Sequence, residues 1–326
     1  LVLFCQTTHA EIIQKNPKDF DMKSIQIHFC VLFIFLILLS VSCSQNVSND
    51  SEISLNETPS IQKARIAFAV SDLSVGTHRL AFGIIEPGIG AVKNEEVKLE
   101  TFFFQNDDRP LLKETLAAKF QSWPVGGKGV YTTDVTFDVP GKWGVGVSFK
   151  STDGIEKKTS SVIKVTEESQ APSIGDKAFP SNNTTTNLSR DISNITTDST
   201  PYKPFYEYSI AESINEGKPI LILFGSPAFC TTGTCGPQID IVKNLHSDFS
   251  EDLVFIHVEI YENPTELKGD ISNAKVVQAV KDWNLPSEPW IFLVDQKGVI
   301  KGRFEGLATY QEIEMALIKN NFLISK

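Results

Sequence analysis

The chain has 326 residues, of which 41% are hydrophobic and 21% are charged, and its formal net charge is −10. This length allows two domains of ordinary size, each with its own core. The acidic balance and the lack of a basic cluster argue against a surface that follows a phosphate backbone, so we expect no nucleic-acid partner.

The N-terminal part is predicted to hold three segments. Residues 1–21 are interpreted as an over-extended start, with a genuine leader as the alternative. In residues 22–43, Met22-Lys23 precedes an apolar run from Phe29 to Leu39, a pattern typical of a signal sequence or a short membrane anchor. Residues 44–61 are rich in Ser, Asn and Glu and predict a flexible tether.

The apolar run closes at Cys43, which Ser42 precedes. This ending resembles a bacterial lipobox, although Ser40 stands where that motif usually carries Leu. We therefore expect lipidation of Cys43 and an extracytoplasmic protein, tethered to the membrane of the cell envelope through its N-terminal anchor. A cleaved secretory signal and an uncleaved span are the alternatives.

Residues 62–168 carry short β-type runs separated by Gly, Pro and Asp. Val145, Val147 and Phe149 alternate with small or polar residues, which indicates one buried face. The spacing predicts an all-β immunoglobulin-like sandwich, whose default role is partner binding or spacing. The predicted strands are Ala64–Val70, His78–Ile85, Val97–Gln105, Val130–Val139, Trp143–Phe149 and Ser160–Val165. The stretch from Gly129 to Val145 resembles paired strands of bacterial extracytoplasmic immunoglobulin-like modules.

Residues 169–201 form a predicted connector rich in Ser, Thr and Asn. It contains triplets of the kind that accept N-linked glycans at Asn182, Asn183, Asn187 and Asn194. A segment of this composition generates such triplets by chance, and we prefer that interpretation.

Helix and strand patterns alternate from residue 202 to residue 326. Helices are predicted over Tyr206–Glu216, from Pro237 onward, over Ala274–Trp283 and over Thr309–Ile324. Strands are predicted over Pro219–Phe224, Leu253–Ile260, Trp290–Asp295 and Val299–Glu305. This order predicts an α/β domain with a central mixed sheet and helices on both faces.

Two of the five cysteines, Cys230 and Cys235, fall in the predicted folded part, between a strand and a helix. A helix N-terminus stabilises a thiolate, so a redox pair is the leading hypothesis, with a structural disulfide and a metal site or inert thiols as alternatives. In an α-helix these Cα atoms would be about 8.7 Å apart, beyond the roughly 7 Å limit for a disulfide. If the thiols pair, residues 230–234 cannot be helical, and Gly233 allows the turn.

This order of elements, the cysteine pair after a strand and Glu288-Pro289-Trp290 before a hairpin resemble the thioredoxin family over Tyr202–Lys326. The stretch from Ser226 to Pro237 resembles the signature of extracytoplasmic, membrane-tethered thioredoxin-like proteins. The resemblance implies a thioredoxin-like fold with a cis peptide at Glu288-Pro289. Thioredoxins place two residues between their cysteines, whereas this Cys-x-x-x-x-Cys motif has four.

The resemblance implies thiol–disulfide exchange in which Cys230 attacks a substrate disulfide and Cys235 resolves the mixed disulfide. An alternative register makes Cys235 the nucleophile. Phe229 and Trp290 would form an apolar rim, and the backbone beside Pro289 would receive the substrate. The expected partners are protein thiols and disulfides, together with an unknown protein that recycles the pair; no cofactor is expected.

The acid that takes up a proton in thioredoxins falls near Leu223 or Phe224 in this sequence, and no carboxylate replaces it nearby. Glu259 and Asp295 are interpreted as strand-end and turn residues.

The main alternative is a non-enzymatic binding module. Copper-delivering relatives of the family hold copper(I) on two cysteines, and here Cys230, Cys235 and His257 would be the ligands. The remaining alternatives are a structural disulfide and an envelope scaffold, and His257 on a central strand is also typical of a hydrogen-bonded core residue.

Overall fold

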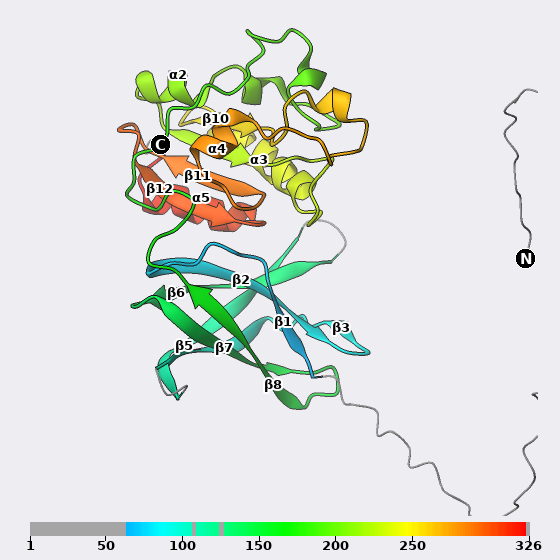
Figure 1. The fold of residues 1–326 in the computed structure, drawn as a ribbon, viewed down its shortest axis with the longest axis vertical. Coiled ribbons are helices and arrows are strands. Elements are labelled where there is room, and N and C mark those ends of the chain that lie inside the picture. The colour runs from blue at the N-terminus through cyan, green and yellow to red at the C-terminus, as the bar shows by residue number, and fades with distance from the viewer. Residues whose placement is uncertain (1–62, 106–108, 124–126, 324–326) are drawn as a thin grey trace, which may run out of the picture. The chain divides into compact units, whose positions relative to one another are not determined.

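The computed structural model describes residues 63–105, 109–123 and 127–323 (Figure 1), which belong to one compact unit, Ile61–Lys326. The predicted start, signal or anchor segment, Cys43 and the tether lie outside the described residues. Within the described ranges no helix has both the length and the apolar character needed to cross a bilayer.

The N-terminal region is a single sheet of eight strands in the order β1-β2-β6-β5-β4-β7-β8, with β3 paired to β2. Every pairing is antiparallel. The strands are β1 Arg65–Phe68, β2 Gly76–Glu86, β3 Gly90–Ala91, β4 Glu96–Phe104, β5 Pro110–Ser122, β6 Gly129–Phe137, β7 Gly141–Lys150 and β8 Glu156–Val165. The sheet curls until its edges almost meet, and there Thr159 Oγ1 in β8 donates a hydrogen bond to the carbonyl of Ala64, next to β1.

The predicted β-rich character of this region is confirmed, but the two-sheet immunoglobulin-like sandwich is wrong. Alternation along a strand determines which side chains are buried, and it is the same in a sandwich and in a curled sheet. The two architectures differ in whether the backbone hydrogen bonds between neighbouring strands continue where the strands bend. Here the register between β4 and β5 shifts between Thr101 and Phe102, and β4 continues on the far side of this bulge. Such a bulge bends a strand without ending the sheet.

Strand β5 was not predicted, although it lies between β4 and β6 and pairs with both. Its sequence contains Leu, Lys, Glu and Ala, residues that favour helices when nothing else decides. Two neighbouring strands supply its backbone hydrogen bonds, and this tertiary context overrides the local preference.

The curled sheet encloses an apolar core around Tyr131, Phe137 and Trp143, all fully buried. The Tyr131 hydroxyl donates to the Val92 carbonyl and accepts from the Asn94 N–H, at 3.2 and 2.8 Å. The polar end of this ring is therefore satisfied by backbone groups.

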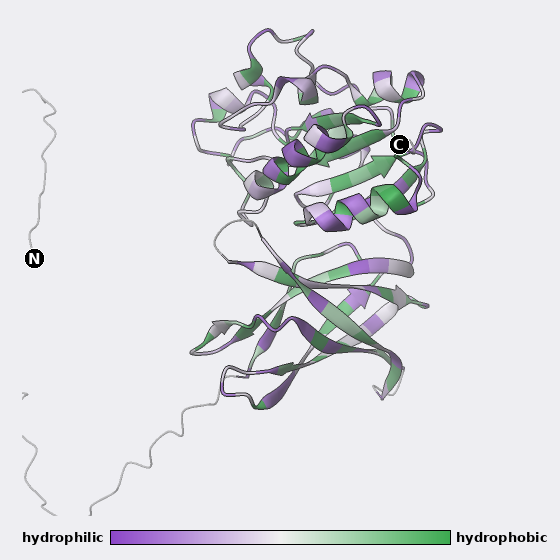
Figure 2. Cartoon of the chain, turned by 180° about the vertical axis from the view of Figure 1, so that it is seen from behind, coloured by the Kyte–Doolittle hydropathy of each residue, from purple (hydrophilic) through white to green (hydrophobic). Residues whose placement is uncertain are grey.

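The C-terminal region has a four-stranded mixed sheet, as predicted, in the order β10-β9-β11-β12. Strand β9 (Ile220–Phe224) is parallel to β10 (Val254–Val258) and antiparallel to β11 (Trp290–Val294), which is antiparallel to β12 (Ile300–Glu305). All residues of β9 and β11 are buried, and Figure 2 shows these strands in the green of apolar residues.

Helices cover both faces of the mixed sheet. Helices α3 (Cys235–Phe249) and α5 (Tyr310–Lys319) pack on the face that contains Leu221 and Leu223. Helices α2 (Ile210–Asn215) and α4 (Gln278–Asp282) pack with Ile220, Ile222 and Phe224 on the opposite face. Short 3-10 helices span Ile192–Asn194, Lys203–Tyr206 and Pro264–Leu267.

The predicted connector packs onto the mixed-sheet region. Ala171 and Ala178 belong to the same core as Ile210, and Lys177 forms an antiparallel bridge with Val299. Asn183 is buried and its Oδ1 accepts a hydrogen bond from the Ile210 N–H at 2.8 Å. This residue has no room for a glycan in the folded protein.

Two shielded ion pairs join the curled sheet to the mixed-sheet region. Arg79 in β2 binds Glu312 in α5 at 2.8 Å. Asp72 binds Arg303 in β12 at 2.9 Å, and its side chain is 3% exposed. The two predicted domains thus have separate cores and shared polar contacts.

Candidate functional site

The cysteine pair lies where β9 leads into α3: Cys230 is in the ten-residue turn between them, and Cys235 is the first residue of α3. Cys230 and Cys235 form a disulfide with Cα atoms 5.9 Å apart. Residues 230–234 are turns rather than helix, and Gly233 has φ +68°, as the sequence predicts. The prediction that residues 230–234 are not helical when the thiols pair is therefore confirmed.

The two sulfur atoms lie in different environments. Cys235, the first residue of α3, is 1% exposed, whereas Cys230 is half-buried in the preceding turn. The Cys235 N–H donates to Cys230 Sγ at 3.3 Å, and the Thr232 hydroxyl lies 3.2 Å from the same sulfur. A free N–H group at the positive end of a helix favours thiolate over thiol, so reduction would leave a stabilised, accessible thiolate at Cys230.

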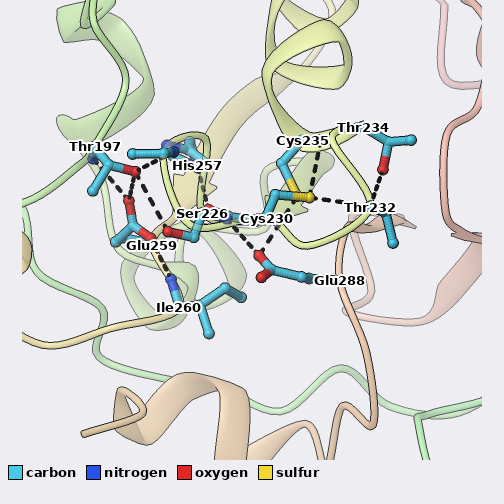
Figure 3. The surroundings of a disulfide bond; sticks show 12 residues. Thr197, Ser226, Cys230, Thr232, Thr234, Cys235, His257, Glu259, Ile260 and Glu288 are labelled. Carbon is cyan, nitrogen blue, oxygen red and sulfur yellow. Dashed lines mark hydrogen bonds between the residues drawn. A yellow bond between two sulfur atoms is a disulfide. The ribbon is translucent and has the colours of Figure 1, made fainter. Parts of the chain in front are cut away.

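Glu288 is the residue of the site that the sequence interpretation missed. It precedes Pro289, and the peptide bond between them is cis, as the resemblance implies. Its Oε2 accepts the Ser226 N–H at 2.7 Å and lies 3.5 Å from Cys235 Sγ (Figure 3). The signal was present, because an acid beside the proline expected to face the cysteines is itself a candidate.

Burial raises the pKa of Glu288 to about 7, and the nearby Glu259 carboxylate adds to this effect, while the hydrogen bond from Ser226 opposes it. A carboxyl group with this pKa is present in both protonation states near neutral pH. Since it lies beside Cys235 Sγ, it is placed to accept a proton from a Cys235 thiol and to return it.

Glu259 lies on the other side of Ser226 and is 3% exposed. It accepts the N–H of Thr197 at 2.8 Å, the Thr197 hydroxyl at 2.7 Å and the N–H of Ile260 at 3.0 Å. Thr197 Oγ1 also accepts the Ala228 N–H at 3.1 Å. The predicted connector thus supports the cysteine turn through Thr197, a role that its composition does not reveal.

His257 does not lie with the cysteines in a group of potential metal ligands, since Glu288 takes that place, and this corrects the copper set of Cys230, Cys235 and His257. Its Nε2–H donates to the Gly225 carbonyl at 2.9 Å and its Nδ1 accepts the Tyr206 hydroxyl at 2.8 Å. Burial lowers the pKa of His257, so the ring is neutral. Both nitrogens are engaged, and the residue is a hydrogen-bonded part of the core.

The three predicted substrate-binding residues are placed differently. Phe229 is half-buried beside the disulfide turn and packs edge-on against Tyr261, with ring centroids 5.9 Å apart. Pro289 and Cys235 both lie beside Gly225, because a Cβ added to Gly225 would be 3.5 Å from Pro289 Cβ and 3.6 Å from Cys235 Sγ. Trp290 is fully buried and stacks on Phe292. It offers no ring surface to a substrate, which corrects its predicted part in the rim.

Cys230, Cys235 and Glu288 also form the group of potential metal ligands found among the described residues. One ligand atom from each lies within 4.8 Å of the others. In the disulfide state the sulfurs are bonded to each other, so only the reduced pair would offer two thiolates.

No protein-family model matches the chain. No curated protein matches it either. Among solved structures, the chain is similar to one described as the thiol:disulfide interchange protein DsbE from Chlorobium tepidum, with 14% sequence identity over 33% of this chain and 82% of that chain. The TM-score of this match is 0.27, and at that value the likeness carries no weight for the fold or the activity.

Proposed function

We propose that the chain is an extracytoplasmic thioredoxin-like protein that exchanges disulfide bonds with protein substrates through Cys230 and Cys235. The observation that carries the proposal is the asymmetry of the pair. One sulfur is accessible and accepts an N–H at the start of α3, while the other is buried beside a carboxyl group. Exchange needs an attacking sulfur that a substrate can reach and a second sulfur that acts afterwards.

The arrangement of the C-terminal region supports a thioredoxin-like fold. Its mixed sheet has helices on both faces, the cysteine turn joins β9 to α3, and Pro289, at the start of β11, lies beside Gly225 of that turn. Backbone groups beside Pro289 are proposed to receive an extended segment of the substrate, with Phe229 as the apolar neighbour.

In the first step the Cys230 thiolate attacks one sulfur of a substrate disulfide. A bond forms between Cys230 Sγ and that sulfur, and the other substrate sulfur leaves as a thiolate. The Cys235 N–H, which donates to Cys230 Sγ at 3.3 Å, stabilises the attacking thiolate before the step.

In the second step Cys235 resolves the mixed disulfide. Its thiol loses a proton to the Glu288 carboxylate, 3.5 Å away, and the resulting thiolate attacks Cys230 Sγ. The substrate leaves with both sulfurs reduced, and the Cys230–Cys235 bond is formed. The reverse sequence transfers a disulfide to a substrate dithiol, with Glu288 returning the proton to Cys235.

Action outside the cytoplasm is proposed from the predicted signal or anchor at residues 22–43 and the lipobox-like Cys43. Disulfides persist in oxidising compartments, and a membrane tether would keep the pair there. A separate protein is proposed to return the pair to its working redox state.

Trapping tests the proposal directly. Cys235→Ser should accumulate a mixed disulfide through Cys230 when the reduced protein meets a disulfide-containing peptide, because the resolving sulfur is missing. Cys230→Ser should accumulate far less, since Cys235 is 1% exposed. Non-reducing electrophoresis and mass spectrometry measure the adduct. Equal trapping by both variants, or by neither, would contradict the proposed roles.

A further inference from the structure

We infer that the reduced protein holds one Zn²⁺ ion on Cys230 Sγ, Cys235 Sγ and Glu288 Oε2, with a fourth position open to water. This site goes beyond the proposed exchange reaction, and it differs in ligand set and in metal from the copper site with His257 that the sequence offers as an alternative.

The distance between two of the ligands already suits zinc. Zn–S and Zn–O bonds are about 2.3 and 2.0 Å long and meet at the tetrahedral angle, so a sulfur and an oxygen on one zinc are about 3.5 Å apart. Cys235 Sγ and Glu288 Oε2 are 3.5 Å apart. These two atoms need no rearrangement to bind one ion.

Only Cys230 has to move. Two thiolates on one zinc are separated by about 3.8 Å, against about 2.05 Å in a disulfide, so its sulfur shifts by roughly 2 Å when the bond is reduced. Residues 231–233, which follow Cys230, are exposed, and Gly233 holds a positive φ.

The donor atoms favour zinc over copper(I). Copper(I) prefers soft sulfur and imidazole ligands, whereas the borderline ion Zn²⁺ accepts both thiolate sulfur and carboxylate oxygen. The imidazole that copper would need is engaged, because His257 is bonded through both nitrogens to Tyr206 and Gly225.

The surrounding groups orient the ligands and leave negative charge for a cation to offset. The N–H of Cys235 donates to Cys230 Sγ and the N–H of Ser226 donates to Glu288, and such outer contacts fix metal ligands in place. Glu259 is the nearby second carboxylate, and Tyr261 is the other titratable group that interacts with Glu288. The positive end of α3 opposes a cation, but its N–H group is directed at the thiolate.

Zinc binding and oxidation exclude each other at this site. Binding displaces the protons of the two thiols, and no electron is transferred. Disulfide formation removes two electrons from the same sulfurs, so the ion must leave first. The bound metal would therefore protect the reduced pair from oxidation and block exchange until it is removed.

The experiment uses the full chain, reduced and freed of metal, titrated with Co²⁺ as a spectroscopic probe and then with Zn²⁺ in competition. We expect one ion per chain, the intense visible bands of tetrahedral Co²⁺ and thiolate-to-cobalt absorption in the near ultraviolet. The oxidised protein and Cys235→Ser should lose these signals. Glu288→Gln should weaken binding by about tenfold or more, while the exposed Glu266→Gln serves as the matched control.

Binding that is unchanged in Glu288→Gln, or stoichiometric binding by the oxidised protein, would overturn the site. So would the absence of binding by the reduced wild type. The proposed exchange reaction is measured separately on the same preparations, in chelator and without metal. A protein that exchanges disulfides but binds no zinc would lose only this inference, and one that binds zinc but exchanges nothing would lose only the proposed function.

Discussion

The buried polar side chains of the curled sheet and of the mixed-sheet region have different surroundings. In the core of the curled sheet the Tyr131 hydroxyl is fully satisfied by the backbone of residues 92 and 94, and residues 62–168 contain no cysteine. In the mixed-sheet region the buried side chains of Glu259 and His257 lie close to the cysteine turn, and Glu288 lies beside Cys235.

This difference shows where the fold tolerates electrostatic cost. Burying a carboxyl group disfavours its charged form, and burial raises the pKa of Glu288 for this reason. The curled sheet also buries a carboxyl group, Glu86, but Lys157 pairs with it and holds its pKa below the ordinary value. Burial and a second carboxylate act on Glu288 instead, and its position beside Cys235 supports the chemical role proposed for it.

The largest expected effect concerns the polar contact between the two regions. Asp72→Ala should lower the free energy of unfolding by about 3 kcal/mol, because it leaves Arg303 shielded without its partner. Asp72 also accepts the N–H groups of Gln170 and Ala171, at 2.9 and 3.0 Å. Urea denaturation measures the change. The control is Glu216→Ala, at a half-exposed surface ion pair with Lys218, which should lower the free energy of unfolding by less than about 1 kcal/mol. Equal losses in the two variants would show that the Asp72 contact stabilises the protein no more than a surface ion pair does.

A smaller effect is expected in the core of the curled sheet. Tyr131→Phe should lower the free energy of unfolding by about 1 kcal/mol, since two hydrogen bonds of a buried hydroxyl are lost. The rate of disulfide exchange should stay at the wild-type value. Denaturation and a stopped-flow thiol assay measure the two quantities, and a slower exchange rate would show that the curled sheet takes part in the chemistry.

A third effect is a pH dependence at Glu288 in the oxidised protein. The folded pKa of about 7 lies above the ordinary value of 4.5, so between these values the folded state binds more protons than the unfolded state. Stability should therefore fall as the pH rises through this window and stay reduced above it. Glu288→Gln removes this part of the slope and keeps an acceptor for the Ser226 N–H. Identical slopes for the two proteins in thermal denaturation from pH 4 to 8 would show that the carboxyl is not buried as described.

Local patterns predicted most of the mixed-sheet region. The apolar strand before the turn, the five-residue spacing of Cys230 and Cys235 and the hairpin after Pro289 each depend on residues close in sequence. The helix predicted over Ala274–Trp283 is shorter, Gln278–Asp282, because Val276 pairs with Tyr261 in an isolated bridge. A contact with a distant residue overrides the helical pattern there.

The features that sequence reasoning missed all depend on long-range contacts. Strand β5 exists because it has a partner on each side, and the curling of the sheet depends on contact between its two ends. Glu288 and Thr197 reach the cysteine turn from segments more than 30 residues away along the chain. Nothing in the local composition distinguishes Thr197 from a surface residue, and the one local signal for Glu288 is its place before Pro289.

The reduction potential of the Cys230–Cys235 couple tests the central claim most directly. The purified protein is equilibrated in a series of thiol–disulfide buffers in the presence of a chelator, and the oxidised fraction is read from the mass shift after alkylation. Exchange predicts a potential in the range of known oxidoreductases, about −270 to −120 mV. A potential below about −300 mV would identify a structural disulfide and contradict the proposed chemistry.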